Sequence, residues 1–254
     1  MSADSRPWAV CKYGGTSVAT SATWAQIVAR VRVLLPTHRV WLVVSAVSKV
    51  TNLLLSSITE AVSPSTSGDA RFTSFNAVVK IHEELAASLG CSSVDFIPVS
   101  DLLAELRRLL EGIALTGEAS ARLRARVAAH GELLSSLVGA AFLTRSLTDT
   151  KVTRVDARAL LVSNERGDEG SARGDDVFLE ADVVPSTQPE RADLSAAGAS
   201  VVIAQGFIAS TPEGATCLLG RGGSDTSGAL FAAFCAASHL EIWTDVNGMF
   251  SVSV

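Results

Sequence analysis

Residues 39–45 read RVWLVVS, a continuous apolar run with the length of one strand. Such a run is typical of a strand that is covered on both faces, as in a parallel sheet. Residues 8–12 (WAVCK) predict a second short buried strand, which ends in a Gly-Gly turn. Residues 23–35 and 50–62 have the apolar spacing of helices. The order strand, helix, strand, helix predicts a parallel sheet with right-handed crossovers.

The remaining sequence continues this α/β pattern. Residues 70–145 are mostly helical in pattern, with expected breaks near residues 90–94 and at Gly112, and we expect them to form a helical layer beside the sheet. Residues 164–176 (NERGDEGSARGDD) are polar and rich in glycine, which is typical of a loop or lid. Further elements are predicted as follows: strands at 151–155, 200–205 and 240–245, a hairpin at 205–219, and a helix at 224–238.

Composition excludes several classes of protein. Of the 254 residues, 48% are hydrophobic and 19% are charged, which is the composition of a chain that forms a core. The net charge is -5 and no run of Lys and Arg suggests nucleic-acid binding. The most apolar stretch, residues 228–237, is about half as long as a membrane-spanning helix needs to be, and the N-terminus has no apolar signal segment. Four scattered cysteines without a CxxC pair indicate reduced thiols. We therefore expect a soluble, cytoplasmic protein with no nucleic-acid or membrane partner.

Two glycine-rich segments have the character of phosphate-binding loops. Residues 12–17 (KYGGTS) follow the first strand, so the glycines open the backbone to a phosphate while Lys12 supplies a point charge. Residues 219–227 (LGRGGSDTS) precede a helix that Ser224 or Asp225 can cap, and Arg221 adds a planar fork suited to a carboxylate or phosphate. The first segment is not a Walker P-loop, because its lysine precedes the glycines. The alternative for the first segment is an ordinary strand-to-helix turn with a surface lysine, and the alternative for the second is a purely structural role.

Three further segments carry polar residues at candidate site positions. Residues 45–52 (SAVSKVTN) follow a strand, residues 243–248 (WTDVNG) follow the last one, and Glu132 lies in residues 130–136 (HGELLSS). Each has a structural alternative: a helix cap for the first, a simple turn for the second, and charge complementation at a helix N-terminus for Glu132. Four of the five segments follow predicted strands, and ligands bind at that edge of open α/β sheets. Together they predict a phosphoryl-transfer site without a Walker motif.

These segments resemble, in order, the signature segments of aspartate kinases, which belong to the amino-acid kinase superfamily. The similar segments are KYGGTSV, VVSAVSKVTNLL, HGELLSS, QGFIAS, LGRGGSDTSGAL and EIWTDVNG. The resemblance extends from about Val10 to Phe250. It implies a three-layer α-β-α sandwich around a mainly parallel eight-stranded sheet. It also implies that residues 1–254 form one catalytic domain, with aspartate bound by residues of about 8–160 and nucleotide by an incomplete part of about 161–254.

The resemblance also implies the role of individual residues. By analogy, Lys12 contacts the transferred phosphate, Arg221 binds the α-carboxylate of aspartate, Glu132 binds its α-amino group, and Asp225 joins the first two as a catalytic residue. Further substrate-binding positions are Ser45, Thr51, Phe207 and Ser224. Positions next to the nucleotide are Lys12, Gly14, Gly15, Thr16, Gly222, Gly223, Thr244, Asp245 and Phe250.

The reaction implied is transfer of the γ-phosphate of ATP to the β-carboxylate of L-aspartate, giving 4-phospho-L-aspartate, the first step toward lysine, threonine and methionine. Magnesium would be held mainly by the ATP phosphates, and no metal ligands of the protein are expected. Aspartate carries two carboxylates and an ammonium, so a selective pocket needs a fixed cation and a fixed anion. Its β-carboxylate, with a reference pKa of about 3.9, needs no general base near neutral pH.

The sequence departs from the family at several points. Lys49 stands where most relatives carry a small residue, and Phe250 stands where a tyrosine is common. The family's later segment and its ACT regulatory domains do not follow, so the chain resembles a truncated domain, either a homo-oligomer or part of a longer polypeptide. Two alternatives stay open: another amino-acid kinase, acting on glutamate, acetylglutamate, carbamate or UMP, and a catalytically impaired or regulatory fragment that binds ligand without turnover.

Overall fold

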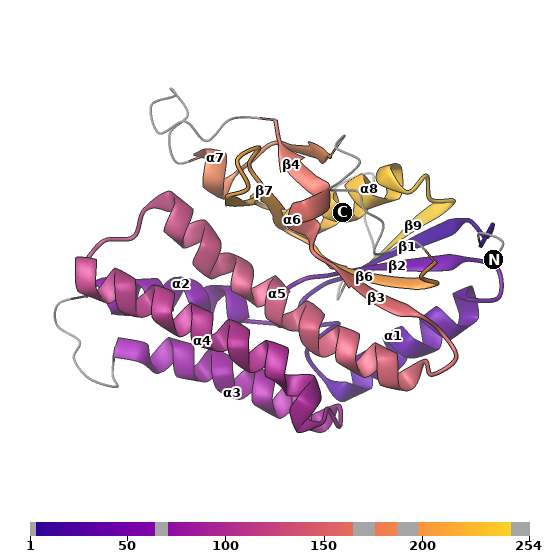
Figure 1. Cartoon of the computed structure of the whole chain (residues 1–254), viewed down its shortest axis with the longest axis horizontal. Helices are drawn as coiled ribbons and strands as arrows, with labels where there is room; N and C mark the ends of the chain where they lie inside the picture. The colour runs from indigo at the N-terminus through magenta and orange to yellow at the C-terminus, as the bar shows by residue number, and fades with distance from the viewer. Residues whose placement is uncertain (1–3, 64–70, 165–175, 187–197, 245–254) are drawn as a thin grey trace, which may run out of the picture.

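The computed structural model describes residues 4–63, 71–164, 176–186 and 198–244 (Figure 1). Its strands form two sheets. The first has five strands in the order β3-β6-β2-β1-β9, and every neighbouring pair is parallel. The second has four strands in the order β5-β4-β7-β8. The strands are β1 (Trp8–Tyr13), β2 (Arg39–Val44), β3 (Val152–Val155), β4 (Leu161–Ser163), β5 (Val183–Pro185), β6 (Val201–Gln205), β7 (Ile208–Ser210), β8 (Thr216–Leu218) and β9 (His239–Trp243).

Alternation along the strands divides the interior into two cores. On β2, Leu42 and Val44 face one core while Trp41 and Val43 face the other. Because successive side chains point to opposite faces, a strand buried on both sides must be apolar throughout. The RVWLVV sequence of β2 is therefore the one expected of a strand at the centre of the sheet.

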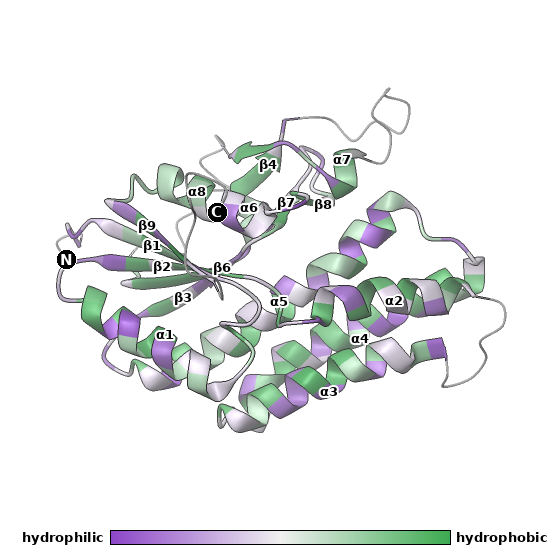
Figure 2. Ribbon diagram, turned by 180° about the vertical axis from the view of Figure 1, so that it is seen from behind, coloured by the Kyte–Doolittle hydropathy of each residue, from purple (hydrophilic) through white to green (hydrophobic). Residues whose placement is uncertain are grey.

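The helices cover both faces of the five-stranded sheet (Figure 1). Helices α1 and α5 lie on one face and α8 on the other, while α2, α3 and α4 pack beside α5. The helices are α1 (Ser21–Leu34), α2 (Val50–Val62), α3 (Thr73–Ser88), α4 (Ser93–Thr116), α5 (Ala121–Ser146), α6 (Ala157–Leu160), α7 (Asp176–Leu179) and α8 (Gly223–Phe234). Hydrophobic and hydrophilic residues mix around α2, α3 and α4, as expected of amphipathic helices (Figure 2). This arrangement confirms an α/β fold with a mainly parallel sheet.

The structure departs from two of the expectations. The single eight-stranded sheet is not confirmed, because the described strands divide into sheets of five and four. Helix α4 runs through Gly112 and ends at Gly117, whose φ of 73° closes the helix. Gly112 costs about 1 kcal/mol relative to alanine, which packing of α4 on its neighbours offsets. Most of the segment 164–176 and the whole of 245–254 lie outside the described residues.

Helix α5 is long and apolar enough to cross a membrane by composition alone. However, 72% of its most apolar window is buried inside the domain. Its apolar residues contact both cores rather than facing outward. Helix α5 is therefore a core helix, and it passes directly behind the site described next.

Candidate functional site

Four strands of the five-stranded sheet end level with one another. Tyr13 of β1 lies opposite Val44 of β2 and Trp243 of β9, and Val44 lies opposite Gln205 of β6. The residues that follow these ends include Gly14, Ser45, Gly206 and Thr244. Segments 12–17 and 45–52 therefore lie together at the carboxyl edge of one sheet. Segment 219–227 instead follows β8 of the four-stranded sheet.

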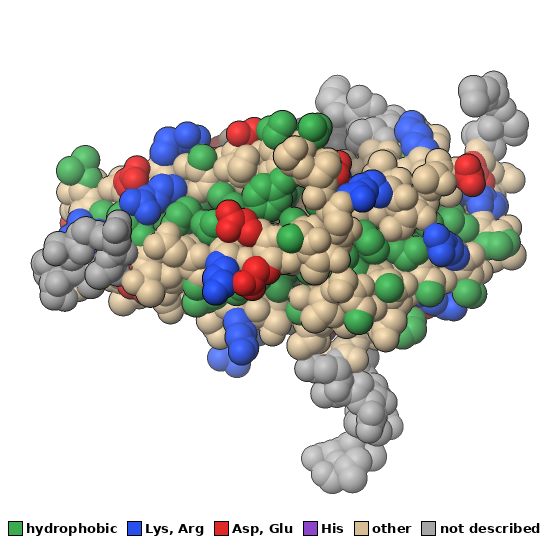
Figure 3. All heavy atoms as spheres, turned by 90° about the horizontal axis from the view of Figure 1, so that it is seen from below, with side chains coloured by type: hydrophobic (Ala, Val, Ile, Leu, Met, Phe, Trp, Pro, Cys, Tyr) green, Lys and Arg blue, Asp and Glu red, His purple; other side chains and the backbone are tan. Residues whose placement is uncertain are grey.

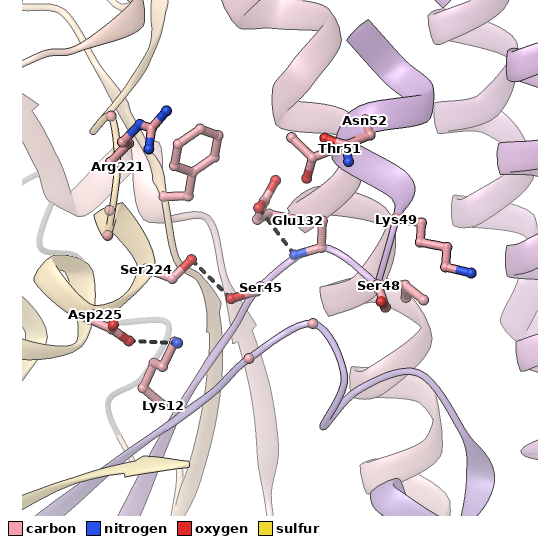
Figure 4. A pocket seen from close by; sticks show the side chains of 18 residues that line it. Lys12, Ser45, Ser48, Lys49, Thr51, Asn52, Glu132, Arg221, Ser224 and Asp225 are labelled. Carbon is pink, nitrogen blue, oxygen red and sulfur yellow. Dashed lines mark hydrogen bonds and ion pairs between the residues drawn. The ribbon is translucent and has the colours of Figure 1, made fainter. Parts of the chain in front are cut away.

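A cavity of about 490 Å³ lies at this edge (Figure 4). Its size suits a small molecule with several polar groups. It is lined by residues from both halves of the chain. They are Lys12, Gly14, Gly15, Ser45, Ala46, Val47, Ser48, Lys49, Thr51, Asn52, Glu132, Phe207, Gly220, Arg221, Gly222, Gly223, Ser224 and Asp225.

Lys12 is a buried cation held at the floor of this cavity. Its ammonium is 2.6 Å from Oδ1 of Asp225, in the first turn of α8, and Lys12 as a whole is 8% exposed. A Cβ on Gly14 would stand 3.8 Å from the Lys12 ammonium, so the missing side chain leaves space in front of the charge. A fixed cation beside an open backbone suits an anionic group such as a phosphate.

Gly15 sits where no side chain fits. A Cβ there would be 2.7 Å from the carbonyl oxygen of Ala46, and the Ser48 N–H donates to the Gly15 carbonyl at 3.1 Å. Because both neighbours are backbone, neither can move away by changing rotamer.

We expect Gly15→Ala to push the 14–17 turn away from the 45–52 segment, and to lower kcat/KM for the phosphoryl transfer predicted from the sequence by on the order of tenfold or more. Gly214→Ala is a contrasting control, since that glycine has open space around it and lies in the hairpin turn. It should lose stability through its φ of +85° but leave kcat/KM near the wild-type value. Steady-state kinetics and thermal melts of both variants check this, and equal kinetics in both would contradict it.

Glu132 forms the back wall of the cavity. It lies in the middle of α5 and is only 3% exposed, so the alternative of a helix N-terminal charge is wrong. One carboxylate oxygen accepts from the Ala46 N–H at 3.1 Å, and the other is buried without a partner among the described residues. Burial raises the pKa of Glu132 to about 8. Gly131 makes this approach possible, since a Cβ on it would be 2.7 Å from the Ala46 Cβ.

The facing wall comes from the segment after β6 and from the start of α8. The Ser45 hydroxyl donates to the Ser224 hydroxyl at 3.0 Å, which joins the two halves of the chain at the cavity floor. Phe207 has a φ of 68°, and its N–H donates to the Ser227 hydroxyl at 2.9 Å. Arg221 lies across the cavity from Glu132 in Figure 4 and forms no ion pair with any residue that the structure describes.

Most of the site residues predicted from the sequence line one cavity. Thr16 and Thr244 are exposed and do not line it, and Asp245 and Phe250 lie outside the described residues. The polar lining residues that the sequence does not single out as site residues are Ser48, Lys49 and Asn52, all within the 45–52 segment. The sequence cannot predict the hydrogen bond from the Ala46 N–H to Glu132, because every residue except proline has a backbone N–H.

The sequence model of the Amino acid kinase family matches residues 7–252. The chain belongs to this family. This amino acid kinase is similar to several curated proteins along nearly its whole length. It is 34% identical to bifunctional aspartokinase/homoserine dehydrogenase 1, chloroplastic, of Arabidopsis thaliana, over 96% of this chain and 26% of that protein. It is 33% identical to lysine-sensitive aspartokinase 3 of Escherichia coli, over 95% of this chain and 50% of that protein.

Solved structures are similar to this amino acid kinase in fold as well as sequence. Aspartokinase III of E. coli in complex with lysine and aspartate (T-state) has a TM-score of 0.76 at 31% identity, covering 95% of this chain and 50% of that one. The same enzyme in complex with aspartate and ADP (R-state) has a TM-score of 0.72 at 30% identity. The chain thus spans about half the length, or less, of these relatives.

Proposed function

We propose that this chain is an aspartate kinase domain, which transfers the γ-phosphate of ATP to the β-carboxylate of L-aspartate. The observation that carries the proposal is Glu132, a buried carboxylate that lines the same cavity as Arg221 and has one oxygen without a partner among the described residues. A buried carboxylate oxygen without a donor calls for a cationic donor from a ligand. The α-amino group of an amino acid supplies one, and the arginine fork suits its α-carboxylate.

The remaining residues fit the second half of the reaction. The β-carboxylate of aspartate is ionised near neutral pH, so it attacks phosphorus directly and no proton has to be removed. Charge that develops on the transferred phosphoryl group is stabilised by the Lys12 ammonium and by backbone N–H groups of the glycine loops. The Asp225 carboxylate holds Lys12 in place before the reaction, at a separation of 2.6 Å.

ATP and magnesium fit the residues present. The space that Gly14 leaves in front of Lys12 suits a phosphate. The lining carboxylates are Glu132, held by the Ala46 N–H, and Asp225, paired with Lys12, so they form no cage for a bare metal ion. Among the described residues no group of three or more His, Cys, Asp and Glu could hold a metal. We infer that the ATP phosphates would hold magnesium, which would supply positive charge beside the transferred group.

Arg221→Lys should raise KM for aspartate by on the order of tenfold, because a point charge cannot copy a bidentate guanidinium. The kcat value should change much less, since the α-carboxylate is bound equally in the ground state and the transition state. Arg108→Lys, on the helix α4, is a matched control that should leave both constants unchanged. A wild-type KM in Arg221→Lys would contradict the assigned role.

The proposed function is tested by ADP release from this 254-residue chain with ATP, magnesium and a panel of acceptors. We expect release with L-aspartate and none with acetylglutamate or UMP, which lack a free α-amino acid. Release with glutamate or carbamate alone would favour another amino-acid kinase. Binding of ATP and aspartate without turnover would favour the fragment that binds ligand but does not react.

The cellular location and assembly stay predictions from the sequence. We propose a cytoplasmic enzyme that is a homo-oligomer or part of a longer polypeptide. On the face shown in Figure 3, cationic and anionic side chains are interspersed rather than gathered by sign. That distribution is compatible with small-molecule partners, aspartate and ATP, and gives no support to a nucleic-acid partner.

A further inference from the structure

A buried hydrogen-bond network joins helix α5, which carries Glu132, to the end of β6. The side-chain oxygen of Gln205 accepts from the Ala157 N–H at 2.8 Å, and its amide nitrogen donates to the Ser136 hydroxyl at 2.7 Å. The same hydroxyl accepts from Arg154 Nε at 2.9 Å and donates to the Leu133 carbonyl at 2.9 Å. Gln205 and Ser136 are both fully buried. None of these side chains lines the cavity.

The network joins the two walls that would hold the substrate. Ser136 lies one helical turn after Glu132 on α5, so the two residues move together. Gln205 is the last residue of β6, and Phe207 follows it by two positions. The bond of 2.7 Å between Gln205 and Ser136 therefore ties the helix of Glu132 to the strand end that leads into the opposite wall.

The segment after Gln205 needs such an anchor because its backbone is strained. Phe207 has a φ of 68°, and a left-handed conformation at a bulky residue costs about 1–3 kcal/mol unless its surroundings impose it. Backbone bonds hold both sides: Gly206 N–H donates to Val44 at 2.9 Å, and Leu219 N–H donates to Phe207 at 2.9 Å. Gly206 also touches Ser224 closely, since a Cβ there would be 2.9 Å from the Ser224 Cβ.

We propose that Gln205 and Ser136 are positioning residues that fix the separation between Glu132 and the wall formed by Phe207 and Ser224, and so set the affinity for aspartate. The inference rests on the proposed function, because it concerns the substrate that both walls would bind. A fully paired polar network in a core specifies one arrangement of the elements that it joins. An apolar core at the same place would pack α5 on β6 without fixing their register, and substrate sites tolerate displacements of about 1 Å poorly.

Gln205→Met keeps the side-chain length and removes both hydrogen bonds. We expect KM for aspartate to rise about tenfold, with kcat and KM for ATP changed by less than about twofold. Ser136→Ala should act in the same direction, and the double variant should be little worse than either single one, because both break the same bond. Gln205→Glu keeps the acceptor for the Ala157 N–H and should recover part of the loss.

Arg154→Met is the matched control. Arg154 donates to the same Ser136 hydroxyl, but from β3, an edge strand whose end does not line the cavity. This variant should lower the melting temperature while leaving KM for aspartate near the wild-type value. This control thus distinguishes a loss of stability from a loss of substrate positioning.

The outcomes separate the two proposals. If the wild-type chain shows no aspartate-dependent ADP release, the proposed function fails, and this inference fails with it. If the wild type is active, an unchanged KM for aspartate in Gln205→Met overturns the inference alone. An equal rise in KM for aspartate in Arg154→Met also overturns the inference, because it would indicate a general loss of ordered packing. Should Gln205→Met not fold, Gln205→Glu decides, and a wild-type KM there together with one in Ser136→Ala overturns it.

Discussion

Lys12→Ala is expected to lower kcat by on the order of a hundredfold or more while changing KM for aspartate little. The Lys12 ammonium is held by Asp225 at 2.6 Å at the end of β1, so its position is fixed before the substrate arrives. Charge that moves onto the transferred phosphoryl oxygens meets a cation that needs no reorganisation. Removing one such preorganised group costs about 3 kcal/mol in the transition state. Initial rates of ADP release over a range of aspartate and ATP concentrations measure both constants.

Two further variants define what the Lys12 result means. Asp225→Asn keeps the shape of the partner but frees the ammonium to move, so we expect a smaller loss in kcat, about tenfold. Lys80→Ala removes the same charge from the surface of α3, where the side chain is 74% exposed, and should leave kcat unchanged. A wild-type kcat in Lys12→Ala would contradict the role of this lysine, whatever the control shows.

The carboxyl edge of the five-stranded sheet was predictable because it depends on strand order and strand composition alone. An apolar run such as residues 39–45 has to be a covered strand, and covered parallel strands end at a common edge. The observed strand registers agree with this rule, because Tyr13 lies beside both Val44 and Trp243. Lys12, Gly14 and Ser45 follow directly from that arrangement.

Other features depended on contacts that no local pattern encodes. Glu132 follows a glycine and precedes an apolar run, which looks like a helix start, yet packing of α2 against α5 extends the helix through Gly131. The end of α4 was expected at Gly112 and occurs at Gly117, because tertiary packing outweighs the roughly 1 kcal/mol preference against one glycine. The sequence does not predict the three-residue strands β4 and β5, which are too short to show a period. Strands β7 and β8 are equally short, but the turn-rich residues between them indicate a hairpin.

Glu132→Gln is expected to raise KM for aspartate by on the order of thirtyfold or more. The substitution keeps an oxygen for the Ala46 N–H but removes the charge that the α-amino group would meet in a buried site. Losing one member of a buried charge pair costs about 2–5 kcal/mol. The same variant should discriminate less between aspartate and analogues without the amino group. Competition by such analogues in the ADP-release assay measures that change.

The wild-type enzyme should show the same carboxylate in its pH dependence. With a pKa of about 8 in the empty site, Glu132 is protonated at neutral pH and must ionise to bind an ammonium. The value of KM for aspartate should therefore fall as the pH rises toward 8, by up to about tenfold per pH unit, and then level off. In Glu132→Gln this dependence should be absent between pH 6 and 8.

The stability of the protein should fall over the same pH range, because ionised Glu132 is buried and has no substrate ammonium to pair with. In the unfolded chain Glu132 titrates near the ordinary value of 4.5, and in the folded protein near 8. Between these values the folded state holds a proton that the unfolded state has released, so the free energy of unfolding falls as the pH rises through this window. Above pH 8 both states are ionised and the full penalty, on the order of a few kcal/mol, is present. Glu132→Gln should thus melt about 5–10 °C above wild type at pH 9 and close to it at pH 5. Equal melting temperatures at pH 9 would contradict this prediction. They would show that the protein itself stabilises the ionised carboxylate, so that the ammonium of aspartate would add little by binding there.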